Sequence, residues 1–515
     1  MKPFVNEPFS DYANPSVREA MLSALKKARA ETGRTFPLWI DGQEINNSQT
    51  FTSTNPTDPS EALATFSKAT REQTLAAVDA ATKAFLSWSR VDPKQRAQRL
   101  LRAAEILRER KHLFSAILTL EVGKTWPEAD GDTAEAIDFM EFYAREMLRL
   151  DQPQPLTKIP GEENELRYIP LGVGAVIPPW NFPLAILVGM TTAALVSGNT
   201  VVLKPASDSP WIAYRFLEIL HEAGFPKDVV QFLTGSGSEI GDALVTSPKV
   251  RFISFTGSKE VGLRINELAA KPQPGQRWIK RVVAEMGGKD GILVDETADT
   301  EAAAKAIVAS AFGFSGQKCS ACSRAIVHEK VYEAVLDRVL ELTRGLVVGD
   351  PVDPATHVGP VVSASAQKKI LEYIEIGKSE GKLLLGGQRP DRPGYFVAPT
   401  VFEGIEPKHR IFQEEIFGPV VAFTKVSSFE EGLAAINDTE FGLTGSLFSK
   451  SEERLREAKE RFHVGNLYLN RKCTGALVGV HPFGGFNMSG TDSKAGGHDY
   501  LLLFTQAKLI SKKIS

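Results

Sequence analysis

One cysteine stands in a setting that suits a nucleophile. Residues 312–324 read FGFSGQKCSACSR, so Cys319 follows two glycines and a lysine and precedes small polar residues. The attacking form of a thiol is the thiolate, which nearby cations and backbone N–H groups stabilise. The alternative for one intracellular thiol is a buried, inert side chain. Whether Cys319 carries chemistry therefore depends on the groups around it.

Two polar residues elsewhere could assist such a thiol. Asn181, in the segment PWNFP, ends an apolar run, where its amide could donate to a developing oxyanion; otherwise it is a turn residue. Glu285, in AEMGGKD, ends another apolar run, where partial burial would raise its pKa toward that of a general base. The alternative for Glu285 is a strand-end acid that backbone groups satisfy. On the residues alone both assignments stay open.

Two glycine turns and a lysine could hold a phosphate-bearing ligand. Gly237, in GSGSEIG, and Gly257, in FTGSKEVG, each follow a predicted strand and open a predicted helix. Glycine lets backbone N–H groups approach a phosphate at a helix N-terminus. Neither turn has the spacing G-x-G-x-x-G, so each is equally an ordinary strand–helix turn. Lys204, in LKPAS, is either a ribose ligand or a plain surface lysine.

The cysteine count argues against disulfides and metals. The chain has three cysteines, Cys319, Cys322 and Cys473, which is too few for a disulfide framework and fits a reducing compartment. Cys319 and Cys322 form a CxxC, but no second pair completes a zinc site. We therefore predict no metal, and we expect Cys322 and Cys473 to be small core residues.

Composition excludes several classes of protein. The chain is 43% hydrophobic and 24% charged with a formal net charge of −3, which supports neither a nucleic-acid surface nor a basic membrane-binding face. The N-terminus lacks the apolar run of a signal peptide. Residues 168–203 carry no charge, but prolines interrupt them, and the apolar piece 184–196 is too short to span a bilayer. We predict a soluble, cytoplasmic protein without membrane insertion.

At 515 residues, the chain is long enough for two or more domains. Helices are predicted over 14–32, 71–89, 93–121 and 133–150, and a hairpin over 39–45. The proline-rich stretch 152–166 is expected to be a flap or linker. From residue 167 strands and helices alternate, which predicts an α/β fold with parallel sheets and a dinucleotide-binding architecture. The predicted strands are 168–177, 201–204, 229–233, 251–255, 323–328 and 420–425, with helices over 184–196, 210–223, 238–245, 258–270, 300–312 and 331–342 and an apolar tail over 499–512.

Seven motifs in order carry a resemblance to a known family. They are PWNFP, KPAS, FTGS, EMGGKD, GQKCSACSR, EEIFGPV and PFGGFNMSG, and their order resembles the aldehyde dehydrogenase superfamily over nearly the whole chain. The resemblance implies the fold of that family, with a Rossmann-like NAD-binding domain, an α/β catalytic domain and a small oligomerisation flap. The implied boundaries are an N-terminal helical arm at 1–38, the NAD-binding domain at 39–151 and 172–286, the catalytic domain at 287–495, and the flap and tail at 152–171 and 496–515.

A closer resemblance is to the Δ1-pyrroline-5-carboxylate dehydrogenase branch of that family. It rests on the N-terminal helical arm, IDFMEFYAREMLR, FHVGNLYLNRKCTGALVGVHPFGGF and the serine after Cys319. The branch oxidises L-glutamate γ-semialdehyde to L-glutamate in proline catabolism. The resemblance implies a covalent thiohemiacetal and thioacyl intermediate on Cys319, with Asn181 holding the oxyanion and Glu285 activating water. The substrate-binding residues that it implies are Phe182, Lys318, Ser320, Gly475, Ala476, Phe483 and Glu135.

The cofactor that the resemblance implies is NAD. Its adenosine ribose would meet Lys204, and its pyrophosphate Ser258 and Trp180. Ser207 stands where many family members have a glutamate that repels a 2′-phosphate, so NADP stays open as an alternative. The cofactor-binding residues implied are Ile177, Pro178, Pro179, Trp180, Lys204, Ala206, Ser207, Gly237, Phe255, Thr256, Gly257, Ser258, Val261, Glu285, Met286, Gly287, Glu415, Phe417 and Phe483.

Two rival functions share these features. A dehydrogenase of another semialdehyde, such as succinate semialdehyde, would keep every catalytic residue and differ in the loop that anchors the substrate; TGA at 474–476 favours an amino-acid semialdehyde. A non-catalytic protein on the same fold is disfavoured because Cys319, Asn181 and Glu285 are all present. The expected partners are a small-molecule substrate, further copies of the chain in a dimer or larger homo-oligomer, and a proline dehydrogenase in transient contact.

Overall fold

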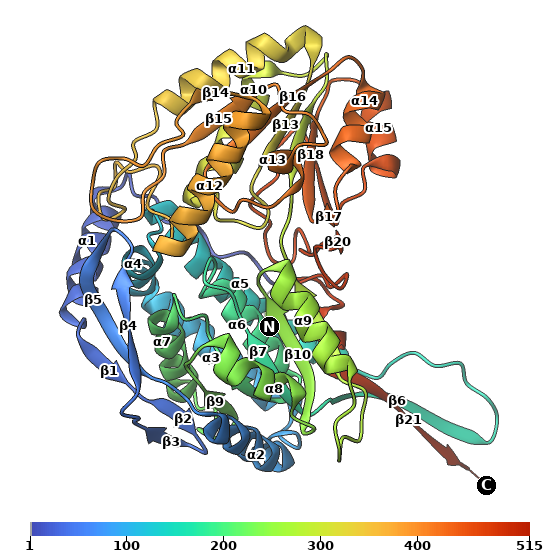
Figure 1. Cartoon of the computed structure of the whole chain (residues 1–515). Helices are drawn as coiled ribbons and strands as arrows, with labels where there is room; N and C mark the ends of the chain where they lie inside the picture. Colours follow the sequence, from blue (N-terminus) through green and yellow to red (C-terminus); the bar gives the residue numbers. More distant parts are fainter. Residues whose placement is uncertain (1–2, 515) are drawn as a thin grey trace.

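The computed structural model describes residues 3–514. Figure 1 shows a body of two sheets with their helices, and a two-stranded ribbon that projects from it. The ribbon pairs β6 (Glu162–Pro170) with β21 (Thr505–Lys513) in antiparallel register. Between residues 3 and 514, no helix combines the length and the apolarity that a bilayer crossing requires.

The first seven-stranded sheet has the order β11-β10-β7-β8-β9-β2-β3, and its strands from β11 to β9 are parallel. Alternate side chains face opposite layers, as a buried parallel sheet requires. Val176 and Leu203 join the cluster of α6 and α7, whereas Ala175 and Val202 join that of α2, α8 and α9. The strands are β2 (Leu38–Ile40), β3 (Gln43–Ile45), β7 (Val173–Ile177), β8 (Thr200–Leu203), β9 (Val230–Phe232), β10 (Val250–Thr256) and β11 (Arg281–Glu285), and the helices are α2 (Arg71–Trp88), α6 (Ala185–Val196), α7 (Pro210–Glu222), α8 (Asp242–Thr246) and α9 (Lys259–Ala270).

A helical layer lies against α6 and α7. Its longest member is α5 (Trp126–Leu150), which packs on α3, α4 and α6. A three-stranded sheet flanks this layer. The remaining elements of this half are α1 (Pro15–Ala30), α3 (Pro93–Glu109), α4 (Lys111–Val122), β1 (Arg34–Phe36), β4 (Thr50–Asn55), β5 (Asp58–Ser67) and the π-helical turn η1 (Gly237–Gly241).

The second seven-stranded sheet has the order β14-β15-β16-β13-β12-β18-β19, parallel except for β14. One face packs on α10 and α11, and the other on α12, α13, α14 and α15. Its elements are β12 (Gly291–Val294), α10 (Thr300–Phe312), the 3-10 turn η2 (Gly313–Gly316), β13 (Arg324–His328), α11 (Glu329–Arg344), α12 (Ala364–Glu380), β14 (Lys382–Leu385), β15 (Thr400–Glu403), α13 (Arg410–Gln413), β16 (Val420–Val426), α14 (Phe429–Asn437), β18 (Thr444–Phe448), α15 (Glu452–Arg461) and β19 (Asn466–Leu469). Outside this sheet β17 (Phe441–Gly442) pairs with β20 (Phe486–Asn487), and the 3-10 turn η3 (Tyr500–Phe504) packs against α5 and α6 of the first half.

The strand order creates a crevice in the first sheet. From β7 the chain continues to β8 on one side, while β10 lies on the other side. The carboxyl ends of parallel strands at such a switch point diverge and bind ligands. Residues 286–290 connect β11 of the first sheet to β12 of the second, so this edge faces the loops of the second sheet.

The α/β prediction is confirmed, and several element bounds need correction. The predicted helix 93–121 is two helices, because Arg110 leaves helical geometry (φ −110°, ψ 16°) and Lys111 turns inward to donate to the Pro8 carbonyl at 2.7 Å. The predicted strand 168–177 is also two strands. Between them, Asn199 Oδ1 accepts bonds from the N–H groups of Leu171 and Gly172, at 2.7 and 2.9 Å.

Other bounds shift with less consequence. The predicted helix 133–150 already begins at Trp126. The predicted helix 238–245 opens as a π-helical turn and continues as α8. The predicted flap 152–166 becomes a strand from Glu162 onward, and the tail begins with a 3-10 turn before it pairs with that strand.

Candidate active site

The loop that carries Cys319 has a fixed, left-handed course. Phe314, Ser315 and Gly316 have φ values of 50°, 56° and 68° in succession. At Gly316 a Cβ atom would lie 2.2 Å from the Gly418 carbonyl oxygen, so only glycine fits there. The Ser315 hydroxyl donates to the Gly359 carbonyl at 2.7 Å. The strain is held by buried contacts, as is common where a chain positions a reactive group.

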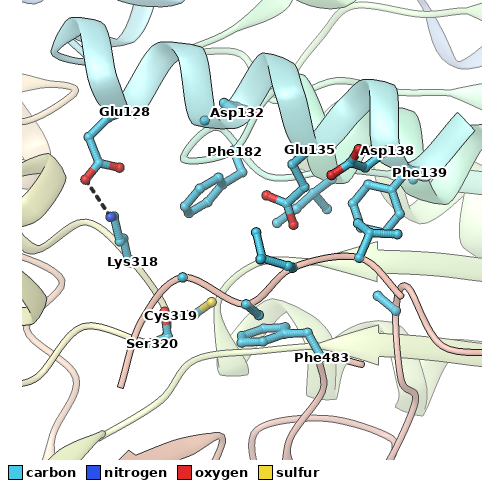
Figure 2. Close-up of a pocket in the computed structure, with 18 of the residues that line it drawn as sticks. Glu128, Asp132, Glu135, Asp138, Phe139, Phe182, Lys318, Cys319, Ser320 and Phe483 are labelled. Carbon is cyan, nitrogen blue, oxygen red and sulfur yellow. Dashed lines mark hydrogen bonds and ion pairs between the residues drawn. The ribbon is translucent and has the colours of Figure 1, made fainter. Parts of the chain in front are cut away.

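Cys319 faces a cavity of about 650 Å³ between α5 and the loops of the second sheet. Figure 2 shows the sulfur pointing into this cavity, across from α5. All seven predicted substrate residues line it, although they come from five separate segments of the chain. The predicted residues in the lining are Glu135, Phe182, Thr256, Glu285, Met286, Lys318, Cys319, Ser320, Gly475, Ala476 and Phe483.

Asn181 is tied to the cysteine loop. Its side chain is buried, and Nδ2 donates a hydrogen bond to the Gln317 carbonyl at 3.1 Å. Gln317, two residues before Cys319, is itself fixed because its Oε1 accepts the N–H of Val362 at 2.9 Å. An amide nitrogen carries two hydrogens, so Asn181 keeps one to donate.

Glu285 ends β11 and also lines the cavity. The Ser493 hydroxyl donates to Glu285 Oε1, and the Gly485 N–H donates to Oε2 at 3.3 Å. Burial raises the pKa of Glu285 to about 8, although these bonds and Lys494 act in the opposite direction. A carboxyl group with that pKa exchanges protons near neutral pH, as a general base must.

The thiol of Cys319 is not activated by its static surroundings. Burial raises its pKa well above the ordinary value, and the carboxylates of Asp290, Glu415 and Glu285 add to the effect. The lysine before it does not offset this, because Lys318 Nζ pairs with Glu128 Oε1 at 2.7 Å (Figure 2). The expectation that a neighbouring cation lowers the pKa of this thiol is therefore wrong, and the proton must leave to a base in the cavity.

The loop 474–478, which we call the anchor loop, is held from behind. Gly475 has a φ of 80°, which favours glycine. Arg471 Nη2 donates to the carbonyls of Thr474 and Gly475, both at 3.0 Å. His481 Nδ1 accepts the N–H of Leu477 at 3.2 Å. Arg471 thus occupies the carbonyls of this loop. The N–H groups of Gly475 and Ala476 make no hydrogen bond within residues 3–514.

Helix α5 presents a row of acids to the cavity, at residues 128, 132, 135 and 138 (Figure 2). Asp132 pairs with Lys124 at 2.9 Å, and both side chains are fully buried. Lys124 Nζ also lies 3.9 Å from the ring centroid of Phe182. The Glu135 carboxylate points into the cavity in Figure 2, and burial, followed by Asp132, raises its pKa to about 8.

The predicted cofactor residues gather along the crevice of the first sheet. Residues 177–180 begin at the last residue of β7, Lys204 follows β8, and residues 256–258 begin at the last residue of β10. Trp180 meets Phe417 edge to face, with 5.5 Å between ring centroids, and Glu415 Oε1 accepts the Gly288 N–H at 2.9 Å. Most of these residues lie outside the cavity that holds Cys319; the ones not in its lining are Ile177, Pro178, Pro179, Trp180, Lys204, Ala206, Ser207, Gly237, Phe255, Gly257, Ser258, Val261, Gly287, Glu415 and Phe417.

The crevice has features that suit a dinucleotide. Lys204 Nζ is buried and makes a long bond of 3.4 Å to the Pro205 carbonyl; burial lowers its pKa to about 8. The N-terminus of α9 opens at Ser258, where helix N–H groups favour an anion. Beside it, Val261 leaves 44% of its surface exposed, an apolar contact for a flat ring. The donors, the anion site and the apolar surface fit a dinucleotide.

Several functional positions escaped the sequence analysis. Ser493 and Lys494 surround Glu285 from more than 200 positions away, and no motif marks them. Arg471 and His481 could have been noticed, because they flank TGA closely. Cys322 and Cys473 are buried and free, as predicted. Within residues 3–514, no group of three or more His, Cys, Asp or Glu side chains is arranged to hold a metal.

Comparisons with known proteins agree with this site. The sequence profile of the aldehyde dehydrogenase family matches residues 39–510. A 1-pyrroline-5-carboxylate dehydrogenase from Geobacillus sp. (strain WCH70) is 57% identical over 512 residues, which are 99% of each chain. The structure of the Thermus 1-pyrroline-5-carboxylate dehydrogenase with bound NAD has a TM-score of 0.98 and 51% identity, covering 100% of both chains. Proline utilization A from Bdellovibrio bacteriovorus has a TM-score of 0.98 and 43% identity, covering 100% of this chain and 54% of that chain. This chain belongs to the aldehyde dehydrogenase family.

Proposed function

We propose that this chain oxidises L-glutamate γ-semialdehyde, which forms from Δ1-pyrroline-5-carboxylate, to L-glutamate with NAD. The observation that carries the proposal is one cavity that brings together Cys319, Glu285 and the anchor loop. Relatives that match the full chain bear the name 1-pyrroline-5-carboxylate dehydrogenase, and the structure of one of them contains NAD. The pathway to which this reaction belongs is the breakdown of proline.

Cys319 is the nucleophile in this proposal. Its sulfur forms a bond to the aldehyde carbon, the carbonyl electron pair moves to oxygen, and Glu285 receives the thiol proton. The oxyanion accepts hydrogen bonds from the Asn181 amide and the Cys319 backbone N–H. A fixed donor of this kind contributes about 3–4 kcal/mol in comparable sites. The bond from Asn181 to the Gln317 carbonyl holds the amide beside the loop that carries the sulfur.

The second half of the reaction releases the acid. The residues that would hold NAD are Lys204, Ser258, Trp180, Glu415 and Phe417. The chemistry that NAD supplies when bound is acceptance of a hydride, which leaves a thioester on Cys319. Glu285 first releases to solvent the proton that it received from the thiol. It then takes a proton from water, the hydroxide adds to the thioester carbon, and the departing thiolate takes that proton from Glu285 while the product acid ionises. The pKa of about 8 suits Glu285 to this exchange.

The substrate is recognised by its amino-acid end. Its α-carboxylate would accept bonds from the Ser320 hydroxyl and from the N–H groups of Gly475 and Ala476. Phe182 and Phe483 both line the cavity (Figure 2), where they would flank the aliphatic middle of the substrate. Glu135 faces the same space, where its carboxylate would attract the ammonium group. Lys318, which pairs with Glu128 and lines the same cavity, is a further proposed substrate contact.

The ribbon is the proposed oligomerisation surface. Leu509 and Ile510 on β21 are 61% and 37% exposed, and apolar side chains on a two-stranded edge suit a partner strand. We propose a homo-oligomer built on residues 152–171 and 496–515, with the other domain bounds as predicted. Transient contact with a proline dehydrogenase has support from the longer PutA chain, which this chain matches over 54% of its length. Three free thiols suit a reducing compartment such as the cytoplasm.

Initial rates with three aldehydes test the function. Pyrroline-5-carboxylate, succinate semialdehyde and propanal are compared, each with NAD and then with NADP. We expect the highest kcat/KM for pyrroline-5-carboxylate with NAD. Equal kcat/KM for propanal would contradict the role of Ser320, Gly475 and Ala476 while leaving aldehyde oxidation intact. No oxidation of any aldehyde would contradict the proposal as a whole.

A further inference from the structure

The first residues of the chain complete the wall of the substrate cavity. Residues 3–13 belong to the predicted N-terminal helical arm but contain no helix or strand, and from here on only these residues are called the arm. Phe9, Ser10 and Tyr12 nevertheless line the cavity beside α5 and the anchor loop. The sequence predicted a helical arm over residues 1–38 and assigned it no site residue. The structure puts the segment before helix α1 at the cavity.

Hydrogen bonds to two buried carboxylates fix the arm. Asn6 Nδ2 donates to Asp138 Oδ2 at 2.8 Å, and the Glu7 N–H donates to Asp138 Oδ1 at 2.6 Å. The Ser10 N–H and hydroxyl donate to the two oxygens of Asp130, at 2.8 and 2.6 Å. Asp130 and Asp138 are 1% and 4% exposed, so these bonds replace water that the carboxylates have lost.

One arm residue also reaches the anchor loop. The second hydrogen of Asn6 Nδ2 points to the Val478 carbonyl at 3.0 Å. Val478 lies two residues beyond Ala476, in the loop whose N–H groups face the substrate carboxylate in the proposed function. The Asn6 amide therefore bridges Asp138 of α5 and Val478 of the anchor loop.

The arm also sets the charge at this end of the cavity. Asp130 and Asp138 both belong to the lining. Lys111 pairs with Asp130 at 3.1 Å, but the hydrogen bonds recorded for Asp138 in residues 3–514 come from the arm. Burial raises the pKa of Asp138 to about 6, and the bonds from Asn6 and Glu7 act in the opposite direction, so the arm helps to keep Asp138 ionised. A charged substrate responds to the protonation state of Asp138 more than an uncharged aldehyde does.

We propose that Asn6 is a positioning residue that sets specificity for the carboxylate-bearing substrate. It holds the anchor loop at its distance from α5, and it supplies a donor to Asp138. The inference rests on the proposed function, because it assigns a residue to that same site. It predicts that the arm matters for the affinity of the charged substrate and not for the chemical step or for NAD.

Asn6→Ala tests the inference in the full-length enzyme. Val5→Ala is the matched control, since Val5 is the neighbouring arm residue and is 80% exposed. We expect the KM for pyrroline-5-carboxylate to rise about tenfold, equivalent to about 1.4 kcal/mol, as for a lost bond to a charged group. The KM values for propanal and NAD should equal those of the wild type. Val5→Ala should change none of the three.

A second variant keeps the test decisive if Asn6→Ala does not fold. Asn6→Asp retains the size of the side chain but faces Asp138 with a second carboxyl group. Its KM for pyrroline-5-carboxylate should exceed that of the wild type at the same pH. The difference should shrink as the pH is lowered, because the pair of carboxyl groups takes up a proton. A proportional rise in the KM for propanal, or no rise for either substrate, would overturn the inference. A wild-type enzyme without preference for pyrroline-5-carboxylate over propanal would overturn the proposed function and the inference together.

Discussion

The hydroxyl of Ser493 donates a hydrogen bond to Oε1 of Glu285, across 208 positions of sequence. Glu285 is buried in the cavity wall, which raises its pKa to about 8, and the bond from Ser493 is the largest opposing effect. A hydrogen bond to the ionised form lowers the pKa of a carboxyl group. Ser493 therefore helps to set the pH at which Glu285 becomes a base.

Ser493→Ala should move the pH profile of the enzyme. Removal of the bond raises the pKa of Glu285 further, so a higher pH is needed to ionise it. We expect the ascending limb of kcat against pH to shift to higher pH, with lower activity at neutrality. The measurement is kcat from pH 6 to 10 for Ser493→Ala, with Ser493→Thr as the variant that keeps the hydroxyl. A limb that stays in place, or moves to lower pH, would show that Ser493 does not act on the base.

Alkylation of Cys319 should be slow in the resting enzyme. Burial and the carboxylates of Asp290, Glu415 and Glu285 raise the pKa of the thiol, so the thiolate fraction at neutral pH is small. We expect iodoacetamide to label Cys319 more slowly than a free thiol at pH 7 and faster as the pH rises. Mass spectrometry of the labelled peptide measures the rate, and Cys319→Ala, which leaves the buried Cys322 and Cys473, is the control. Labelling at pH 7 as fast as a free thiol would contradict the assigned pKa direction.

The sequence predicted what local pattern can encode. The strands β8 and β10 and the helix α10 appeared within a residue or two of their bounds, because apolar runs and helical caps are local. The break at Arg110 was missed because the apolar stripe continues on both sides of it. The break depends on Lys111, whose ammonium turns inward to the Pro8 carbonyl and to Asp130.

The residues of the candidate site fall into two groups, those that local motifs identify and those that only the fold brings together. Residues within motifs, such as Asn181 and Gly475, were found because each motif recurs as a unit. The neighbours that tune them were missed, because their contacts join distant segments. The expectation that a cation beside Cys319 stabilises its thiolate was wrong for this reason, because only the fold places Glu128 beside the Lys318 ammonium. The roles of the site residues remain predictions that the variants test.

The buried pair of Lys124 and Asp132 should be essential to stability. The two side chains are fully buried with 2.9 Å between Nζ and Oδ2, and removal of one partner leaves the other uncompensated. Lys124→Met should cost about 3–5 kcal/mol of the free energy of unfolding. The double variant Lys124→Met/Asp132→Asn should recover most of it, because the amide oxygen still accepts the Ala185 N–H that Asp132 accepts at 2.7 Å. Urea unfolding measures both; equal stability of single variant and wild type would contradict the expectation.

The anchor loop gives the most direct test of substrate recognition. Ala476→Pro removes one N–H donor. A proline also favours an extended conformation in the residue before it, and Gly475, with φ 80°, is not extended. We expect the KM for pyrroline-5-carboxylate to rise at least tenfold, since a lost bond to a carboxylate costs about 1.5–3 kcal/mol. Ala476→Gly, which keeps the N–H, is the matched control and should leave that KM close to wild type. The KM for propanal should change in neither variant, because that aldehyde has no carboxylate to anchor. If Ala476→Pro left the KM for pyrroline-5-carboxylate unchanged, the carboxylate would have to bind elsewhere in the cavity, and the assignment of residues 474–476 to substrate recognition would be wrong.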